Sequence, residues 1–108
     1  MKGDRVLSML GLAMRAGKIK SGSFQVEKAI DKGEGKLILF CTDSATRTLE
    51  MLKEKAERKQ IPVIFYGTME SLGHAIGKED RSCIAVLDEG FSKTIAGYFT
   101  EAETKEQS

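Results

Sequence analysis

The chain has 108 residues and a formal net charge of +1, with 41% hydrophobic and 31% charged residues. This length predicts one domain with one core, and no apolar run approaches the roughly 18 residues that a membrane span needs. No basic segment followed by an apolar one opens the sequence, so we expect no signal peptide and a cytoplasmic location. The expected division is a single domain over residues 1–99 and an acidic, flexible tail over residues 100–108.

The cysteines, Cys41 and Cys83, both fall inside apolar runs, and neither has a CxxC partner. This pattern indicates reduced, buried core thiols. A lone histidine, His74, gives no metal-ligand cluster, and glycine and lysine spacings satisfy no Walker A loop. We therefore expect no catalysis, no metal and no cofactor.

Hydrophobic periodicity predicts helices that alternate with strands along the whole chain. The expected helices cover residues 4–16, 23–32, a third after a cap among Thr42, Asp43 and Ser44, then 69–76 and 91–99. The expected strands lie around Ile19 and over residues 36–42, 61–66 and 82–87. The third helix should bury Ala45, Leu49, Leu52 and Ala56. Such alternation predicts an α/β protein with a layered sheet covered by helices on both faces.

The most informative stretch covers residues 17–28. Gly17 suits the left-handed position after a helix, and Ser21, Gly22 and Ser23 all suit an N-cap. The N-terminus of a helix presents unpaired N–H groups and partial positive charge, and phosphates bind there. The flanking basic residues are Arg15, Lys18, Lys20 and Lys28. RNA is therefore the expected partner of this edge.

The charges are unevenly distributed along the sequence. Basic residues outnumber acidic ones up to residue 36, whereas acidic residues outnumber basic ones from residue 88 onward. This polarity is compatible with a local nucleic-acid patch, although solvated surface charge explains it equally well.

Several short motifs carry a resemblance to a known family. They are Gly11-Leu12-Ala13-Met14-Arg15-Ala16-Gly17-Lys18, Ser21-Gly22, Val26-Glu27-Lys28-Ala29-Ile30, Ala75-Ile76-Gly77-Lys78-Glu79-Asp80-Arg81 and Asp88-Glu89-Gly90-Phe91. In order and spacing they resemble the bacterial YlxQ group, ribosomal-protein-like members of the kink-turn RNA-binding superfamily. The resemblance covers about residues 4–99. It implies a three-layer α/β/α sandwich with a mixed four-stranded sheet, and RNA binding by the start of the second helix and by the loop before the last strand.

Residue by residue, the resemblance is incomplete. Kink-turn binders typically read Gly-Thr/Ala-Asn-Glu-x-x-Lys at the second helix, where Gly22 and Lys28 match and Ser23 and Gln25 are substitutes. Phe24 departs from the pattern, because it lacks the amide of the usual Asn. The loop before the last strand also departs, since residues 77–80 are charged where the family has Gly-Ile-Glu-Val.

Each candidate contact has an alternative. Gln25 and Lys28 share a helix face and would contact a base edge and a phosphate, or form ordinary solvated surface. Phe24 would stack on an unpaired base, or fix the turn by packing on Ile19 or Lys20. The expected RNA-binding set is Lys18, Lys20, Gly22, Ser23, Phe24, Gln25, Lys28, Lys78 and Arg81.

The loop cations Lys78 and Arg81 would grip phosphates, or pair with Glu79 and Asp80 at the surface. The function expected from all of this is noncatalytic binding of structured RNA, such as ribosomal or other kink-turn-like RNA, by a monomer that associates with ribosomes. The alternative is a protein–protein adaptor that kept the fold and lost specific RNA contacts. A small nucleotide-binding or hydrolytic domain is disfavoured by the missing phosphate loop.

Overall fold

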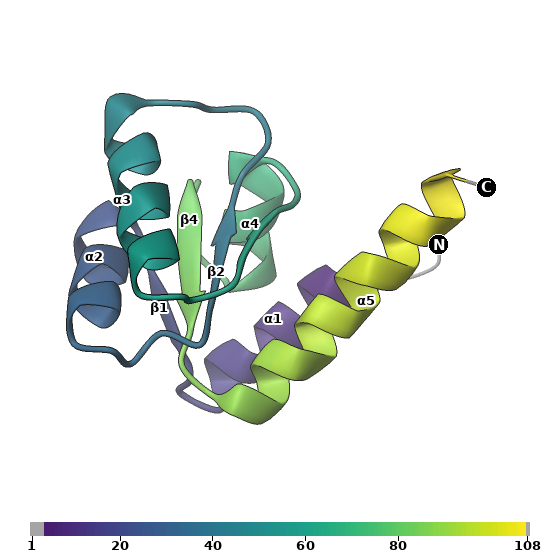
Figure 1. Cartoon of the computed structure of the whole chain (residues 1–108). Helices are drawn as coiled ribbons and strands as arrows, with labels where there is room; N and C mark the ends of the chain where they lie inside the picture. The colour runs from purple at the N-terminus through teal and green to yellow at the C-terminus, as the bar shows by residue number, and fades with distance from the viewer. Residues whose placement is uncertain (1–3, 108) are drawn as a thin grey trace.

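The computed structural model describes the backbone of residues 4–107 and the side chains of residues 4–104. Helices and strands alternate from the first helix to the last (Figure 1). The helices are α1 (Arg5–Arg15), α2 (Ser23–Asp31), α3 (Arg47–Arg58), α4 (Met69–Ala75) and α5 (Glu89–Gln107). The strands are β1 (Ile19–Ser21), β2 (Leu37–Phe40), β3 (Val63–Phe65) and β4 (Cys83–Val86).

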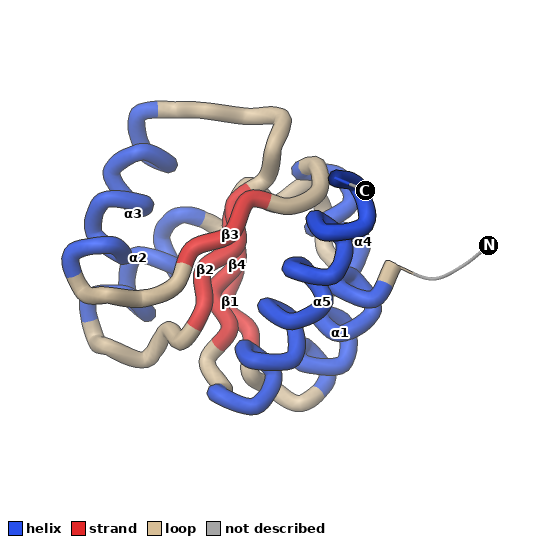
Figure 2. The backbone as a smooth tube through the Cα atoms, turned by 45° about the vertical axis from the view of Figure 1, so that its right-hand side comes forward, coloured by secondary structure: helices blue, strands red, loops and turns tan. Residues whose placement is uncertain are grey.

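The strands form one mixed sheet in the order β1-β4-β2-β3. β4 is antiparallel to both of its neighbours, whereas β2 and β3 are parallel. Helices α2 and α3 cover one face of the sheet, and α1, α4 and α5 cover the other (Figure 2). The expected three-layer α/β/α sandwich with a mixed four-stranded sheet is confirmed.

The core runs through the two central strands. All four residues of β2 and all four of β4 are buried, as expected for strands covered on both faces. Each helix contributes one apolar stripe, for example Val26, Ala29 and Ile30 of α2. The two edge strands, β1 and β3, flank this core, and the end of β1 lies beside the start of β4.

The third helix begins later than expected. Thr46 is its N-cap, with the Thr46 hydroxyl accepting a hydrogen bond from the Leu49 amide, and Ala45 is exposed outside the helix. Asp43 instead accepts a hydrogen bond from the amide of Met69 at the start of α4. Thr42 donates to the carbonyl of Gly67. The cap expected among residues 42–44 was therefore wrong, because the helix begins later and the side chains of Thr42 and Asp43 bond to residues 67 and 69 instead.

The last helix continues beyond the expected end at residue 99, since α5 runs to Gln107. Its middle packs on α1, where Arg5 lies over the ring of Tyr98 and pairs with Glu101. The domain boundary expected at residue 99 therefore does not coincide with a change in secondary structure. The flexibility expected for residues 100–108 stays a prediction.

Within residues 4–107, no helix is both long enough and apolar enough to cross a membrane.

Candidate RNA interface

The turn between β1 and α2 is tied to the start of β4. Gly22 occupies the N-cap of α2 with a φ of 87°, in the region that favours glycine. Its amide donates to the carbonyl of Cys83 over 3.1 Å, and its carbonyl accepts from the amide of Val26 over 2.9 Å. Gly17 also has the expected positive φ, 76°, where α1 turns into β1. The sequence therefore fixes the position of the helix start through two glycine turns and one bond to the sheet.

A shallow, open hollow of about 370 Å³ lies in front of this turn. Two segments far apart in the sequence line it, namely the start of α2 and the loop before β4. The lining residues are Ser21, Gly22, Ser23, Phe24, Gln25, Asp80, Arg81 and Ser82. The structure thus brings together the two segments that the resemblance implicated.

Arg81 connects the two sides of the hollow. Its Nε donates to the hydroxyl of Ser21 over 3.1 Å, and one terminal nitrogen donates to the carbonyls of Glu79 and Asp80 over 3.3 and 3.0 Å. The guanidinium therefore bonds to the backbone of the acidic loop residues, rather than to their carboxylates as the alternative interpretation expected. Because of these bonds, Arg81 links the loop before β4 to the turn that begins α2.

The loop before β4 is seated directly on α4. The amide of Lys78 donates to the Gly73 carbonyl over 2.8 Å, and the amide of Arg81 donates to the Met69 carbonyl over 3.0 Å. Gly73 makes this approach possible, because a Cβ at this position would overlap the carbonyl of Glu79. The loop therefore lies against a bare helix surface.

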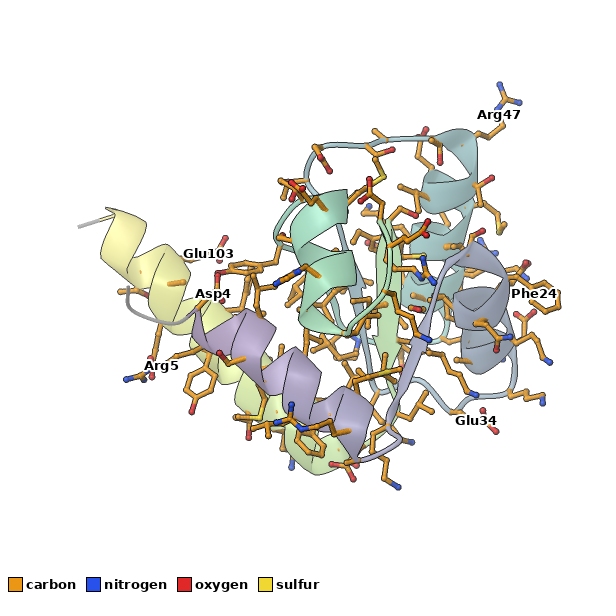
Figure 3. The ribbon with its side chains drawn as sticks, turned by 180° about the vertical axis from the view of Figure 1, so that it is seen from behind. Asp4, Arg5, Phe24, Glu34, Arg47 and Glu103 are labelled. Carbon is orange, nitrogen blue, oxygen red and sulfur yellow. The ribbon has the colours of Figure 1, made fainter. Side chains whose placement is uncertain are left out.

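Phe24 presents an aromatic ring on the outer face of α2. Its side chain is 69% exposed and points away from the body of the protein (Figure 3). The ammonium of Lys28, one turn later, lies 5.5 Å from the ring centroid, a cation–π geometry. So exposed a ring does not fit the alternative in which Phe24 fixes the turn by packing.

None of the four expected lysines, Lys18, Lys20, Lys28 and Lys78, lines the hollow. Lys20 is exposed and directly precedes Ser21 in β1. Lys18 lies at the opposite end of β1, where its carbonyl accepts from the amide of Leu87, and it does not line the hollow. Lys78 is exposed at the far end of the loop and does not line it either.

Three lining residues, Ser21, Asp80 and Ser82, were not in the expected set. The sequence pattern favours Ser21 as a helix cap, and it favours Asp80 as part of a charged loop that pairs with Lys78 or Arg81. Their adjacency to Gly22 and Arg81 in sequence was the available signal. Only the fold shows that they face the same hollow.

The thiols beside the interface are kept neutral. Burial raises the pKa of the Cys83 thiol to about 11, and burial also raises the pKa of Cys41. Both thiols are buried, as expected. Among the described residues, no group of three or more His, Cys, Asp or Glu side chains is arranged to hold a metal ion.

The family model and the relatives that match this chain point to the same family. Residues 4–96 match the model of the ribosomal protein L7Ae/L30e/S12e/Gadd45 family. The RNA-binding protein YlxQ of Bacillus subtilis (strain 168) is 35% identical over 95 residues, which is 88% of this chain and 95% of that protein. The large ribosomal subunit protein eL8 of Thermoplasma volcanium is 29% identical over 93 residues, covering 85% of this chain and 77% of that protein.

Solved structures agree with this assignment. A protein of unknown function from Bacillus halodurans superposes with a TM-score of 0.84 at 40% identity, covering 89% of this chain and 97% of that one. The 15.5kD RNA binding protein of Giardia lamblia shares the fold with a TM-score of 0.74 at 18% identity, over 93% and 86% of the two chains. The chain therefore belongs to the ribosomal protein L7Ae/L30e/S12e/Gadd45 family.

Proposed function

We propose that the protein binds structured RNA, without catalysis, through the first turn of α2 and the loop before β4. The observation that carries this proposal is that both segments line one open hollow and are joined there by the Arg81–Ser21 hydrogen bond. Two relatives, named as an RNA-binding protein and a ribosomal protein, support the partner class.

The first turn of α2 suits a phosphate. No side chain caps it, because Gly22 occupies the N-cap, so its N–H groups are open to an acceptor. The partial positive charge of the helix start adds to the attraction. A phosphate of the RNA backbone would lie at Gly22 and Ser23, and the neighbouring cations Lys20 and Lys28 would add to its binding.

Base contacts would come from Phe24 and Gln25. The exposed ring of Phe24 can stack on an unpaired base, and the Gln25 amide offers an acceptor and two donors to a base edge. Lys18 and Lys78 lie outside the hollow and would contact phosphates at its periphery. This arrangement favours RNA with unpaired or splayed bases over a plain duplex.

Kink-turn RNA is the specific target class that we propose, with a reduced affinity. Phe24 replaces the usual Asn, and the charged residues 77–80 replace an apolar loop, so contacts typical of that recognition are lost. Association with ribosomes and action as a cytoplasmic monomer complete the proposal.

The test is filter binding of the purified protein to total cellular RNA over a range of salt concentrations. We expect retention at low salt and a negative slope of log affinity against log salt, because each neutralised phosphate releases counterions. A kink-turn RNA, a plain hairpin and a duplex then rank the specificity. Absence of retention at low salt would contradict RNA binding and leave the adaptor alternative.

A further inference from the structure

A second cavity lies at the opposite end of the sheet from the RNA interface. The hollow of the RNA interface adjoins Cys83, the first residue of β4, whereas Leu37 at the start of β2 pairs with Val86 at the end of β4. A pocket of about 460 Å³ opens beside Leu37. Its lining residues are Gly33, Gly35, Lys36, Leu37, Lys59, Gln60, Ile61, Pro62, Glu89, Ser92, Lys93 and Ala96. This volume falls in the range of small-molecule sites, roughly 300–1,000 Å³.

A buried polar group in the pocket lacks a partner. Ser92 is only 6% exposed, and its hydroxyl has no hydrogen-bond partner among the described residues. An unpaired buried hydroxyl is costly, because it loses water without a replacement. The hydroxyl oxygen itself is closed off from solvent, although Ser92 lines the pocket. A rotation of the Ser92 side chain toward the cavity would bring the hydroxyl within reach of a polar atom of a bound ligand.

The charges around the pocket favour an anion. Lys36, Lys59 and Lys93 line it together with one carboxylate, Glu89. Lys36 and Lys93 form no ion pair within the described part of the chain. The ammonium of Lys59 donates to the carbonyl of Asp31, which covers one of the carbonyls at the end of α2.

The remaining wall is apolar. Leu37, Ile61, Pro62 and Ala96 come from β2, from the segment before β3 and from α5. Such a wall suits a planar ring, whose faces are apolar while its edge carries hydrogen-bonding atoms.

We propose that this pocket binds a small organic anion with a planar ring. The ring lies on the apolar wall, an edge atom bonds to the Ser92 hydroxyl, and the anionic group lies near Lys36 and Lys93. A phosphate and a carboxylate satisfy the same lysines, so the shared chemistry is an anionic group attached to a ring.

The test is a titration followed by backbone amide NMR, with adenosine monophosphate and 2-naphthoate as the two probes. Adenosine lacks the charge and inorganic phosphate lacks the ring, so both serve as controls. We expect at least one probe to shift amides around residues 33–37 and 59–62 at millimolar concentration, and to bind at least about tenfold tighter than either control. Adenosine monophosphate alone would identify a phosphate ligand, and 2-naphthoate alone would identify a carboxylate ligand.

Two pocket variants and one charge-matched control make the test specific. Ser92→Ala should weaken the better probe by about 3- to 10-fold, the effect of one hydrogen bond, and Lys93→Glu should weaken it by at least about tenfold. Arg47→Glu changes the net charge equally, and Arg47 lies at the opposite end of the α2/α3 layer from the pocket-side loop at Glu34 (Figure 3). This control should leave the affinity unchanged.

Three results would overturn the proposal. They are the absence of amide shifts with both probes, equal losses for Lys93→Glu and Arg47→Glu, and displacement of the probe by RNA. The last result would assign the pocket to the RNA surface. Because the probes are small molecules and the RNA assay uses a different end of the sheet, either function can fail alone.

Discussion

The Nε of Arg81 donates a hydrogen bond to the hydroxyl of Ser21 over 3.1 Å, and this bond joins residues 60 positions apart in the sequence. It holds the loop before β4 against the turn that starts α2. The same guanidinium bonds to two carbonyls within the loop, so one side chain sets the shape of both sides of the hollow.

Loss of the Arg81–Ser21 hydrogen bond should weaken RNA binding, although neither atom of this bond contacts the RNA directly. We expect Ser21→Ala to reduce affinity for structured RNA by about 3- to 10-fold, the effect of one hydrogen bond, because the loop is less well positioned. A double-mutant cycle with Arg81→Met measures the coupling. If Arg81 acts through Ser21, the two losses should not add.

Additive losses in that cycle would contradict the positioning role and indicate that Arg81 contacts phosphate independently. Circular dichroism of each variant should show that the fold is retained. The slope of log affinity against log salt distinguishes the two roles further, since only a lost phosphate contact lowers it by about one unit.

The residues at the start of α2 should contribute to RNA binding in two different ways, some to overall affinity and others to the preference among RNAs. Lys28→Ala should weaken binding to every RNA by a similar factor and lower the salt slope by about one unit, because it removes a phosphate contact. Phe24→Ala and Gln25→Ala should instead change the preference among a kink-turn, a hairpin and a duplex. Loss of a base stacked on Phe24 should cost roughly 1–3 kcal/mol for RNA with unpaired bases.

Lys32→Ala is the matched control for these variants, since Lys32 is an exposed lysine at the other end of α2. It should leave both affinity and preference almost unchanged. If Lys28→Ala behaves like Lys32→Ala, the site at the start of α2 is wrong. Tight, selective binding of wild type to the kink-turn would retain the site and contradict the reduced affinity expected from Phe24.

Substitution of Gly73 tests the close packing of the loop before β4 against α4. Gly→Ala in a helix interior usually stabilises by about 0.5–1 kcal/mol. At Gly73 the added Cβ would overlap the Glu79 carbonyl, so we expect Gly73→Ala to lower the free energy of unfolding by about 1–3 kcal/mol, the usual cost of overpacking, and to weaken RNA binding.

Gly97→Ala is the matched control, because nothing lies within 4 Å of a Cβ built there in α5. It should stabilise the protein by about 0.5–1 kcal/mol and leave RNA affinity unchanged. Urea unfolding measures both effects. Equal stabilisation by the two substitutions would contradict the close contact between the loop and α4.

The sequence predicted elements well where periodicity and glycine act locally. The continuous apolar run over residues 37–41 predicted a buried strand, observed as Leu37–Phe40. Gly17 has the expected positive φ, and Gly22 is the expected N-cap of α2. The start of α3 was wrong, because the partner of Asp43 is the amide of Met69, 26 residues away. A side chain that can cap a helix has the same sequence signature whether it bonds to the next helix or to one far along the chain.

The candidate site was predicted only in part for the same reason. Gly22–Gln25 are contiguous and form a visible helix start, whereas Asp80 and Ser82 join them through pairing of β1 with β4. The pocket around Ser92 is lined by three separate segments, residues 33–37, 59–62 and 89–96. No local pattern signals that this serine's hydroxyl is buried.

Cys83 should make stability fall at alkaline pH. Burial disfavours the thiolate and raises the pKa of this thiol from its ordinary value of 9.0 to about 11 in the folded protein. Between these pH values the unfolded chain has released the proton that the folded chain retains, so the free energy of unfolding falls as pH rises.

The experiment uses Cys41→Ala as the background, since burial raises the pKa of Cys41 as well. The free energy of unfolding is measured for Cys41→Ala and for the double variant Cys41→Ala/Cys83→Ala. The value for the single variant minus the value for the double variant should fall by about 1 kcal/mol from pH 8 to pH 10. Urea unfolding at each pH measures this difference, and a difference that stays constant over this range would show that the Cys83 thiol titrates alike in both states.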